Sequence, residues 1–300
     1  MRPPVRRPSR AHVALAIAAG VLAMLLYAGQ FVISRWSIQR TLSVWDLGAL
    51  RFSVAGTLML AVVARHGLAN AAGIGWRRAL VLGVTVGAPY TLIMFSGLSI
   101  APASHGAVII PGFTPVVSAL LAWWWLGQSL GHAMLGGLAI IVTGLVLVSG
   151  AGVLTDASGM VWVGDLLFVV AAILWAAFTV LARRWHVDPV RGTAIVWVLS
   201  LAYLPVYVAF AGSRLLAAPR GEVVLQALYQ GVGVAIVALA LYAWSIRILG
   251  PATASLFMPL TPVFGVLLAV PTLGEIPTPV QALGILAVSG GMVLAAGRRS

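Results

Sequence analysis

The sequence has no cysteine and no lysine, and it is almost as poor in acidic residues. The absence of cysteine excludes disulfide bonds, thiolate metal sites, iron–sulfur clusters and cysteine nucleophiles. Six residues are Asp or Glu, and charged residues of both signs make up 8% of the chain, about a third of the usual share in a soluble domain. So few charges cannot cover the water-exposed surface of a chain of 300 residues, so we expect it to be embedded in lipid.

Motifs of the common enzyme and cofactor classes are also missing. The five histidines lie far apart and show no metal-ligand spacing. The chain contains no GxGxxG after a strand-like run, no Walker loop and no GxSxG. The net charge of +12 comes from arginines that are dispersed over termini and connectors, not from one basic patch. We therefore predict a protein that is not an enzyme, with no catalytic residue, cofactor, metal site or nucleic-acid partner.

Long apolar runs occupy most of the chain, of which 61% is hydrophobic. A helix that crosses a bilayer needs roughly 20 predominantly apolar residues. With charged residues, prolines and glycines as boundaries, the sequence divides into ten such segments, which predicts an all-α integral membrane protein. The predicted spans are 11–33, 45–64, 78–99, 103–125, 132–150, 161–182, 192–211, 223–246, 251–273 and 278–297.

The arginines indicate how these spans are oriented. The stretch MRPPVRRPSR resembles the start of a signal peptide, but the apolar segment that follows is too long for a signal core. We predict a short disordered arm at residues 1–10 that precedes the first transmembrane helix. With this arm inside, thirteen arginines are cytoplasmic and four are external, as the positive-inside rule requires. Both termini are therefore predicted to be cytoplasmic.

One proline-containing stretch occurs twice. PGFTPVVSALLAWWWLGQ at residues 111–128 matches PLTPVFGVLLAVPTLGE at residues 259–275, with an offset of 147. The same offset pairs Gly137 with Gly284 and Gly144 with Gly291. Ten spans in two halves give five per half, and an odd number forces the second half to enter the membrane from the opposite side. The chain is thus predicted to hold two inverted five-helix repeats, residues 11–150 and 151–300, an architecture of many secondary transporters.

These features also carry a family resemblance. The paired PGFTP and PLTP segments, the Leu-Gly-Glu at residues 273–275, Gly284, Gly291 and the Arg51 of LGALRF resemble the ten-helix EamA-type permeases of the drug/metabolite transporter superfamily. Gln128 departs from that pattern, because the first half often carries Glu at this position. The resemblance implies a bacterial inner-membrane protein that works by alternating access. It also implies export of small metabolites, among them aromatic amino acids.

The repeated prolines are candidate hinges. A proline inside a helix removes a hydrogen bond and displaces the carbonyl four residues earlier, and lipid tolerates the freed carbonyl only where it faces protein or a watery cavity. We predict that these prolines line a central cavity and allow its helices to flex; the alternative is a structural kink away from the substrate. The four residues are Pro111, Pro115, Pro259 and Pro262.

The candidate substrate site consists of polar and aromatic residues within the spans. Such walls suit amphipathic solutes, although each residue could equally serve ordinary helix packing. Tyr90 and Trp175 are the strongest candidates, because mid-membrane Tyr and Trp lie away from their usual interfacial belt. Arg51 could meet a substrate carboxylate, but a salt bridge or snorkelling is the more common role. The full set is Tyr27, Gln30, Tyr90, Met94, His105, Phe113, Trp175, Phe178, Tyr242 and Phe257.

The acidic residues limit the kind of transport. All six lie in connectors or within about a turn of a helix end, whereas proton-coupled export of cationic drugs usually needs a carboxylate at depth. We therefore predict movement down a gradient, and leave open a proton route through His105. The predicted function is export of amino acids with hydrophobic or aromatic side chains, with the bilayer and a small-molecule substrate as partners. The alternative is a broad-specificity exporter of drugs or other metabolites; a membrane enzyme and a membrane scaffold are disfavoured, and the oligomeric state is open.

Overall fold

The computed structural model describes residues 9–127, 129–155 and 159–296, and this part of the chain consists of helices and connecting segments without a strand. Gln128 and most of the predicted arm, residues 1–10, lie outside the described residues. Ten helical segments of the described chain are long and apolar enough to cross a bilayer. This confirms the prediction of a ten-helix membrane protein.

Six spans are single helices and four are built from consecutive shorter helices. The single helices are α1 (Arg10–Ile38), α2 (Val44–His66), α5 (Ala103–Leu126), α6 (His132–Thr155), α7 (Val161–Arg184) and α14 (Pro279–Ala296). The composite spans are α3–α4 (Trp76–Val86, Ala88–Ile100), α8–α9 (Pro189–Ser200, Tyr203–Phe210), α10–η2–α11 (Arg220–Leu228, Tyr229–Ala238, Leu239–Leu249) and α12–α13 (Pro251–Ser255, Leu260–Leu273). A short 3₁₀ segment, η1 (Leu68–Gly73), follows α2.

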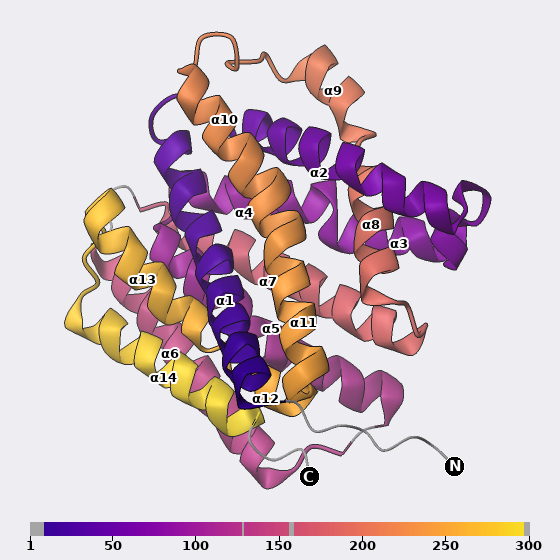
Figure 1. Ribbon diagram of the computed structural model, residues 1–300. Coiled ribbons are helices and arrows are strands. Elements are labelled where there is room, and N and C mark those ends of the chain that lie inside the picture. The colour runs from indigo at the N-terminus through magenta and orange to yellow at the C-terminus, as the bar shows by residue number, and fades with distance from the viewer. Residues whose placement is uncertain (1–8, 128, 156–158, 297–300) are drawn as a thin grey trace, which may run out of the picture.

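The bundle has two distinct ends. α1 begins and α14 finishes at the same end, beside α12 (Figure 1), which we call the termini end. The opposite end, the far end, holds the connection from α1 to α2 and the start of α10 (Figure 1). α1 runs between these ends alongside η2 and α11 of the second half. The two halves of the sequence are therefore interleaved in space.

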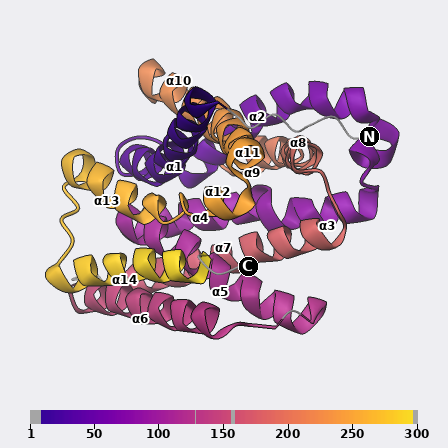
Figure 2. The same ribbon diagram turned by 60° about the horizontal axis from the view of Figure 1, so that its bottom comes forward.

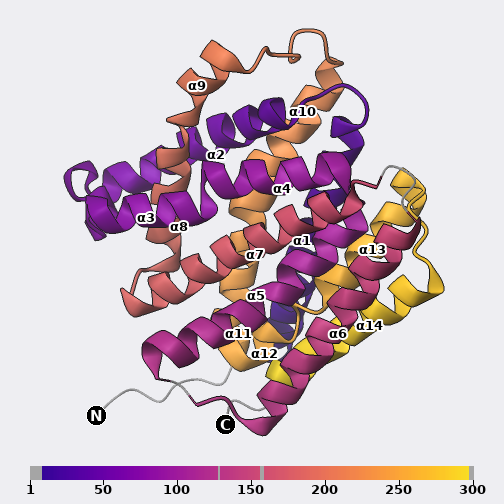
Figure 3. The same ribbon diagram turned by 180° about the vertical axis from the view of Figure 1, so that it is seen from behind.

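α6 and α14 form an outer layer in which they lie side by side (Figures 2 and 3). A Cβ on Gly144 would lie 2.6 Å from the carbonyl oxygen of Gly284, and one on Gly137 would lie 2.8 Å from that of Gly291. The contacts are reciprocal, because a Cβ on Gly284 would meet the carbonyl oxygen of Gly144, and a Cβ on Gly291 would meet that of Gly137. Since Gly137 is the repeat counterpart of Gly284, these exchanged contacts are those that a two-fold axis between the helices produces.

A glycine interrupts the third span. Gly87 ends α3 and precedes α4, and a Cβ there would lie 2.4 Å from the carbonyl oxygen of Gly83 and 2.7 Å from Oγ of Ser200. Any other residue would therefore have to displace the backbone. Pro89 follows in the first turn of α4, where the fixed φ of proline suits a helix start. The repeat counterpart, the eighth span, is also irregular, because η2 is a π-helix.

The two proline pairs lie in different structural settings. α5 remains helical through Pro111 and Pro115. The matching ninth span is interrupted between α12 and α13, where Pro259 is the N-terminal cap of α13 and Pro262 lies in its first turn. Helix interruption thus coincides with only one of the two pairs, and the hinge role of all four prolines stays a prediction.

A buried carboxylate fixes the start of α2. Asp46 accepts hydrogen bonds from the backbone N–H and the hydroxyl of Ser43, while Ser43 Oγ accepts from the Asp46 N–H. This reciprocal capping satisfies N–H groups that the first turn of a helix leaves free. Asp46 also accepts from the Tyr207 hydroxyl and the Arg214 N–H, so it joins α2 to α9 and the segment after α9. The start of α2, and with it the position of Arg51 further along the helix, is firmly held.

Candidate functional site

Three of the predicted site residues form an aromatic cluster. The Tyr90 and Trp175 rings have centroids 5.3 Å apart, and the Trp175 and Phe178 rings have centroids 6.2 Å apart. Tyr90 lies in the first turn of α4, just after the interruption at Gly87, and the other two lie on α7. The two halves of the sequence therefore each contribute to one aromatic surface.

Arg51 lies in a polar environment built from three other spans. Its Nη1 donates to Oε1 of Gln30 on α1, at 3.1 Å, and to Oε1 of Gln230 on η2, at 3.3 Å. Its guanidinium carbon lies 4.8 Å from the ring centroid of Trp197 on α8, a cation–π distance. The side chain is buried, with 4% of the residue exposed.

This environment differs from the roles that we expected for Arg51. A salt bridge would need a carboxylate, but the two ion pairs in the described part of the chain involve other residues. Snorkelling would bring the guanidinium to water, but Arg51 is buried. The reason is the fold, which places two glutamine amides and an indole around a cation that lies two turns from the start of α2.

The aromatic cluster and Arg51 belong to one region. Tyr27 lies within electrostatic range of Arg51, Tyr90 and Tyr242, and Tyr90 lies within the same range of Arg51. The Tyr242 hydroxyl donates to the carbonyl of Ala254, at 3.5 Å. Six predicted residues therefore lie near Arg51 or contact a residue that does. They are Tyr27, Gln30, Tyr90, Trp175, Phe178 and Tyr242. We call this region the central site.

Among the described residues, three further candidates make no hydrogen bond or ring contact with Arg51. Met94 belongs to the same buried cluster as Tyr90, one turn further along α4, and Phe113 packs against that cluster. The ring of Phe257 packs on α1, where a Cβ on Gly20 would lie 2.5 Å from it. Whether these three residues touch a substrate stays a prediction.

His105 belongs to a separate buried network at the far end. Its Nδ1 lies 2.8 Å from Oδ1 of Asp165 on α7, and its Nε2 lies 3.0 Å from the amide nitrogen of Gln281 on α14. His105 is 1% exposed and Asp165 is 5% exposed. Sequence reasoning located Asp165 near a helix start but did not pair it with His105, since 60 residues separate them. The interior at this end therefore contains a carboxylate that is held by a histidine.

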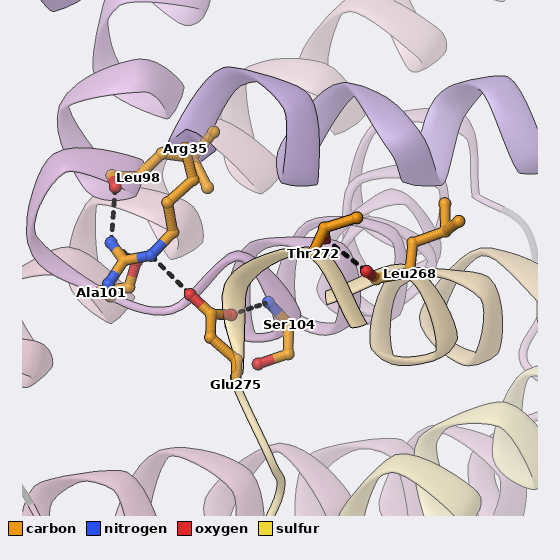
Figure 4. Close-up of polar contacts among 7 residues, drawn as sticks. All are labelled: Arg35, Leu98, Ala101, Ser104, Leu268, Thr272 and Glu275. Atoms are coloured by element: carbon orange, nitrogen blue, oxygen red, sulfur yellow. Dashed lines mark hydrogen bonds and ion pairs between the residues drawn. The ribbon is translucent and has the colours of Figure 1, made fainter. Parts of the chain in front are cut away.

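A second ionic contact at the far end joins Arg35 to Glu275 (Figure 4). Arg35 Nε lies 2.5 Å from Oε1 of Glu275, and Arg35 Nη1 donates to the carbonyls of Leu98 and Ala101. The other Glu275 oxygen accepts from the backbone N–H of Ser104 at the start of α5. This contact joins the end of α1, the end of α4, the start of α5 and the segment after α13.

A row of amides also links the two halves. Gln230 Nε2 donates to Ser34 Oγ, at 2.7 Å, and Gln226 Nε2 donates to the Ile33 carbonyl and to Ser37 Oγ. We did not predict either glutamine as a functional residue. Their spacing of four residues in an otherwise apolar span was the available signal, because it places both amides on one helix face.

Comparison with known proteins agrees with this architecture. The sequence profile of the EamA-like transporter family matches residues 14–150 and 162–297. An "Uncharacterized transporter" from Archaeoglobus fulgidus is 26% identical over 289 residues, which cover 94% of this chain and 96% of that protein. A "Probable terminal-alkyne amino-acid exporter" from Streptantibioticus cattleyicolor is 28% identical over 280 residues, covering 86% of this chain and 92% of that protein.

A solved crystal structure shares the fold. It superimposes with a TM-score of 0.60 and 22% sequence identity, and the match covers 94% of this chain and 96% of the other. At this level of identity the similarity concerns the arrangement of the helices and leaves the substrate to be argued from the site.

Proposed function

This multi-pass membrane protein belongs to the EamA-like transporter family, and from that premise we propose that it exports amino acids with hydrophobic or aromatic side chains. The substrate would pass through the central site by alternating access, without a covalent step. The proposed setting is the bacterial inner membrane, and the distribution of the arginines supports the placement of both termini in the cytoplasm.

The observation that carries the proposal is the aromatic cluster of Tyr90, Trp175 and Phe178. It is built from both halves and borders a helix interruption, and transporters of this inverted-repeat kind bind substrates where broken helices meet. Aromatic walls suit a solute with an apolar side chain, and the amides of Gln30 and Gln230 provide nearby polar groups. The relative described as an amino-acid exporter supports the same substrate class.

The far-end contacts suggest how access would alternate. Arg35 and Glu275 tie α1 to the segment after α13, and the amides of Gln226 and Gln230 tie α1 to α10 and η2. With these contacts formed, we propose that the far end is closed. Opening it would require that α1 part from the second half. The interruptions at Gly87 and between α12 and α13 are the candidate points of bending.

Flux measurements test the proposal. Purified protein in liposomes is given a panel of labelled amino acids, with and without a proton gradient. We expect flux of phenylalanine or of other amino acids with apolar side chains. Flux of a drug or another metabolite without flux of any amino acid would overturn the proposal and favour a broad-specificity exporter. Dependence on the proton gradient would separate antiport, for which His105 and Asp165 are the buried candidates, from movement down a gradient.

A further inference from the structure

Arg51 is a buried cation for which the described residues provide no anion. Its hydrogen-bond acceptors, Gln30 and Gln230, are neutral amides, and its third contact is the ring of Trp197. These groups orient the guanidinium and lower the cost of its burial, but they leave its charge in place. A charge at this depth is expensive and is usually retained for function.

One edge of the guanidinium has no hydrogen-bond partner among the described residues. Both glutamine oxygens accept from Nη1, whereas Nε is buried without any hydrogen-bond partner. Among the described residues, no hydrogen bond involves Nη2 either. The N–H groups of Nε and Nη2 point in the same direction and form a planar fork. This fork matches the two oxygens of a carboxylate.

A second unmatched donor lies in the same contact. Trp197, whose ring faces the Arg51 guanidinium, is 6% exposed, and its indole N–H is also buried without an acceptor. Buried donors in folded proteins are nearly always satisfied, and an exception calls for an explanation such as a missing ligand. A ligand with acceptor oxygens at this place would accept hydrogen bonds from the Arg51 Nε–H and the Trp197 indole N–H, which have no acceptor in the described part of the protein.

We propose that Arg51 binds the carboxylate of the transported solute through its Nε–Nη2 edge. The inference rests on the proposed function for the rest of the solute, whose apolar side chain would lie against Tyr90 and Trp175. It narrows the substrate class to monocarboxylates with an apolar or aromatic group. Amides and amines of the same shape would be rejected: an amide lacks the charge, and an amine brings a cation towards a cation.

Binding measurements on the full-length protein in detergent test this role of Arg51 as the anchor of the substrate carboxylate. The probes are L-phenylalanine, L-phenylalaninamide and phenethylamine, and affinity is read from the shift in unfolding temperature and from calorimetry. Wild-type protein is expected to bind the amide at least about 30-fold more weakly than the acid, as for the loss of one partner of a buried charge pair. The Arg51→Gln variant is expected to lose this preference and to bind acid and amide alike.

Two further variants separate a local effect from a general one. Arg40→Gln is the matched control, since Arg40 also lies over a tryptophan, with its guanidinium carbon 4.7 Å from the Trp36 ring centroid, but outside the central site. It is expected to bind phenylalanine as the wild type does. Arg51→Lys keeps the charge without the planar fork, so it should retain the preference for the acid at reduced affinity. It also provides the test if Arg51→Gln does not fold.

The outcomes distinguish this inference from the proposed function. Wild-type affinity for phenylalanine in Arg51→Gln, or equal binding of acid and amide by the wild type, would overturn the anchor and leave amino-acid export standing. If the wild type binds no amino acid, phenylpyruvate and benzoate are the next probes. Binding of either that depends on Arg51 would support the anchor and refute the proposed substrate. Absence of binding by any of these carboxylates would overturn the anchor.

Discussion

Arg35 and Arg51 lie on consecutive helices, and the structure surrounds their two buried charges with different groups. Arg35 on α1 meets the carboxylate of Glu275 and two backbone carbonyls, in a contact where both side chains are largely buried (Figure 4). Arg51 on α2 meets two neutral amides and an indole ring. The first charge is neutralised by a carboxylate of the chain, whereas the second is oriented but is not neutralised by any residue that the structure describes.

The difference indicates different roles. An ion pair between distant segments holds the far end together as long as it is formed, so Arg35 is suited to closing that end. An unbalanced cation costs several kcal/mol in a low-dielectric interior, and a bound anion would offset that cost. Arg51 is therefore suited to a ligand. Giving Arg51 an anion, or removing the anion of Arg35, should therefore exchange these properties.

The largest effect is expected when Arg51 receives an anion of its own. Gln30→Glu would place a carboxylate where an amide oxygen now accepts from Nη1, so the new side chain would compete with a substrate carboxylate. We expect transport of phenylalanine in liposomes to fall at least about 30-fold, while the unfolding temperature stays level or rises. Transport at the wild-type rate would show that Arg51 does not need an external anion.

The opposite change removes the anion from Arg35. Glu275→Gln leaves Arg35 with carbonyl acceptors only, which should lower the free energy of unfolding by about 1 to 3 kcal/mol and loosen the far end. Because the chain has no cysteine, Ser104→Cys in the same protein provides a single buried labelling site next to Glu275. We expect its thiol to be labelled faster when Glu275→Gln is added. An unchanged labelling rate would contradict the role of this pair in closing the far end.

A smaller effect is expected from the aromatic half of the central site. Tyr90→Ala or Trp175→Ala removes one side of the ring contact, and the lost apolar and aromatic interaction should reduce phenylalanine transport roughly 10-fold. The preference for acid over amide should persist, because Arg51 remains in place. Trp162→Ala is the comparison, since Trp162 lies on the same helix as Trp175 but is exposed and is not a site candidate. Unaltered transport in both Tyr90→Ala and Trp175→Ala would remove the aromatic cluster from the site.

The smallest effect tests the indole N–H. Trp197→Phe keeps a ring that can lie against the Arg51 guanidinium but removes the buried donor. If that donor contributes to anion binding, affinity for phenylalanine should fall about 3- to 10-fold, with no change for phenylalaninamide beyond the loss of packing. Equal effects on the two probes would assign the indole a packing role only.

Much of this architecture was readable from the sequence, and for identifiable reasons. The boundaries of the ten spans follow from hydrophobicity and from the positions of charged residues, prolines and glycines, all of which are local properties. The glycines at 137, 144, 284 and 291 were recognisable by their repeat spacing, and they lie where α6 meets α14. Tyr90 and Trp175 were each singled out by their depth, and the structure places their rings in contact.

The partners of the charged residues could not be read in the same way. Gln230 reaches Arg51 across 179 residues, and Glu275 reaches Arg35 across 240. The predicted spans place Arg51 inside the second span and Arg35 just after the first, but no local feature of either arginine identifies its partner. The proline pairs likewise look alike in sequence, but α5 stays intact while the ninth span is interrupted.

The sequence by itself determined the solvent and the helix count of this protein, and it indicated the duplication, because apolar content, span length and repeat spacing act along the chain. Only the tertiary structure decided which arginine is paired with a carboxylate and which is surrounded by neutral groups, because that depends on which distant helices meet. In a lipid interior an unbalanced charge can be neutralised only by a group that reaches it. Within the described residues, the fold brings Glu275 to Arg35, and it brings two amides and an indole to Arg51.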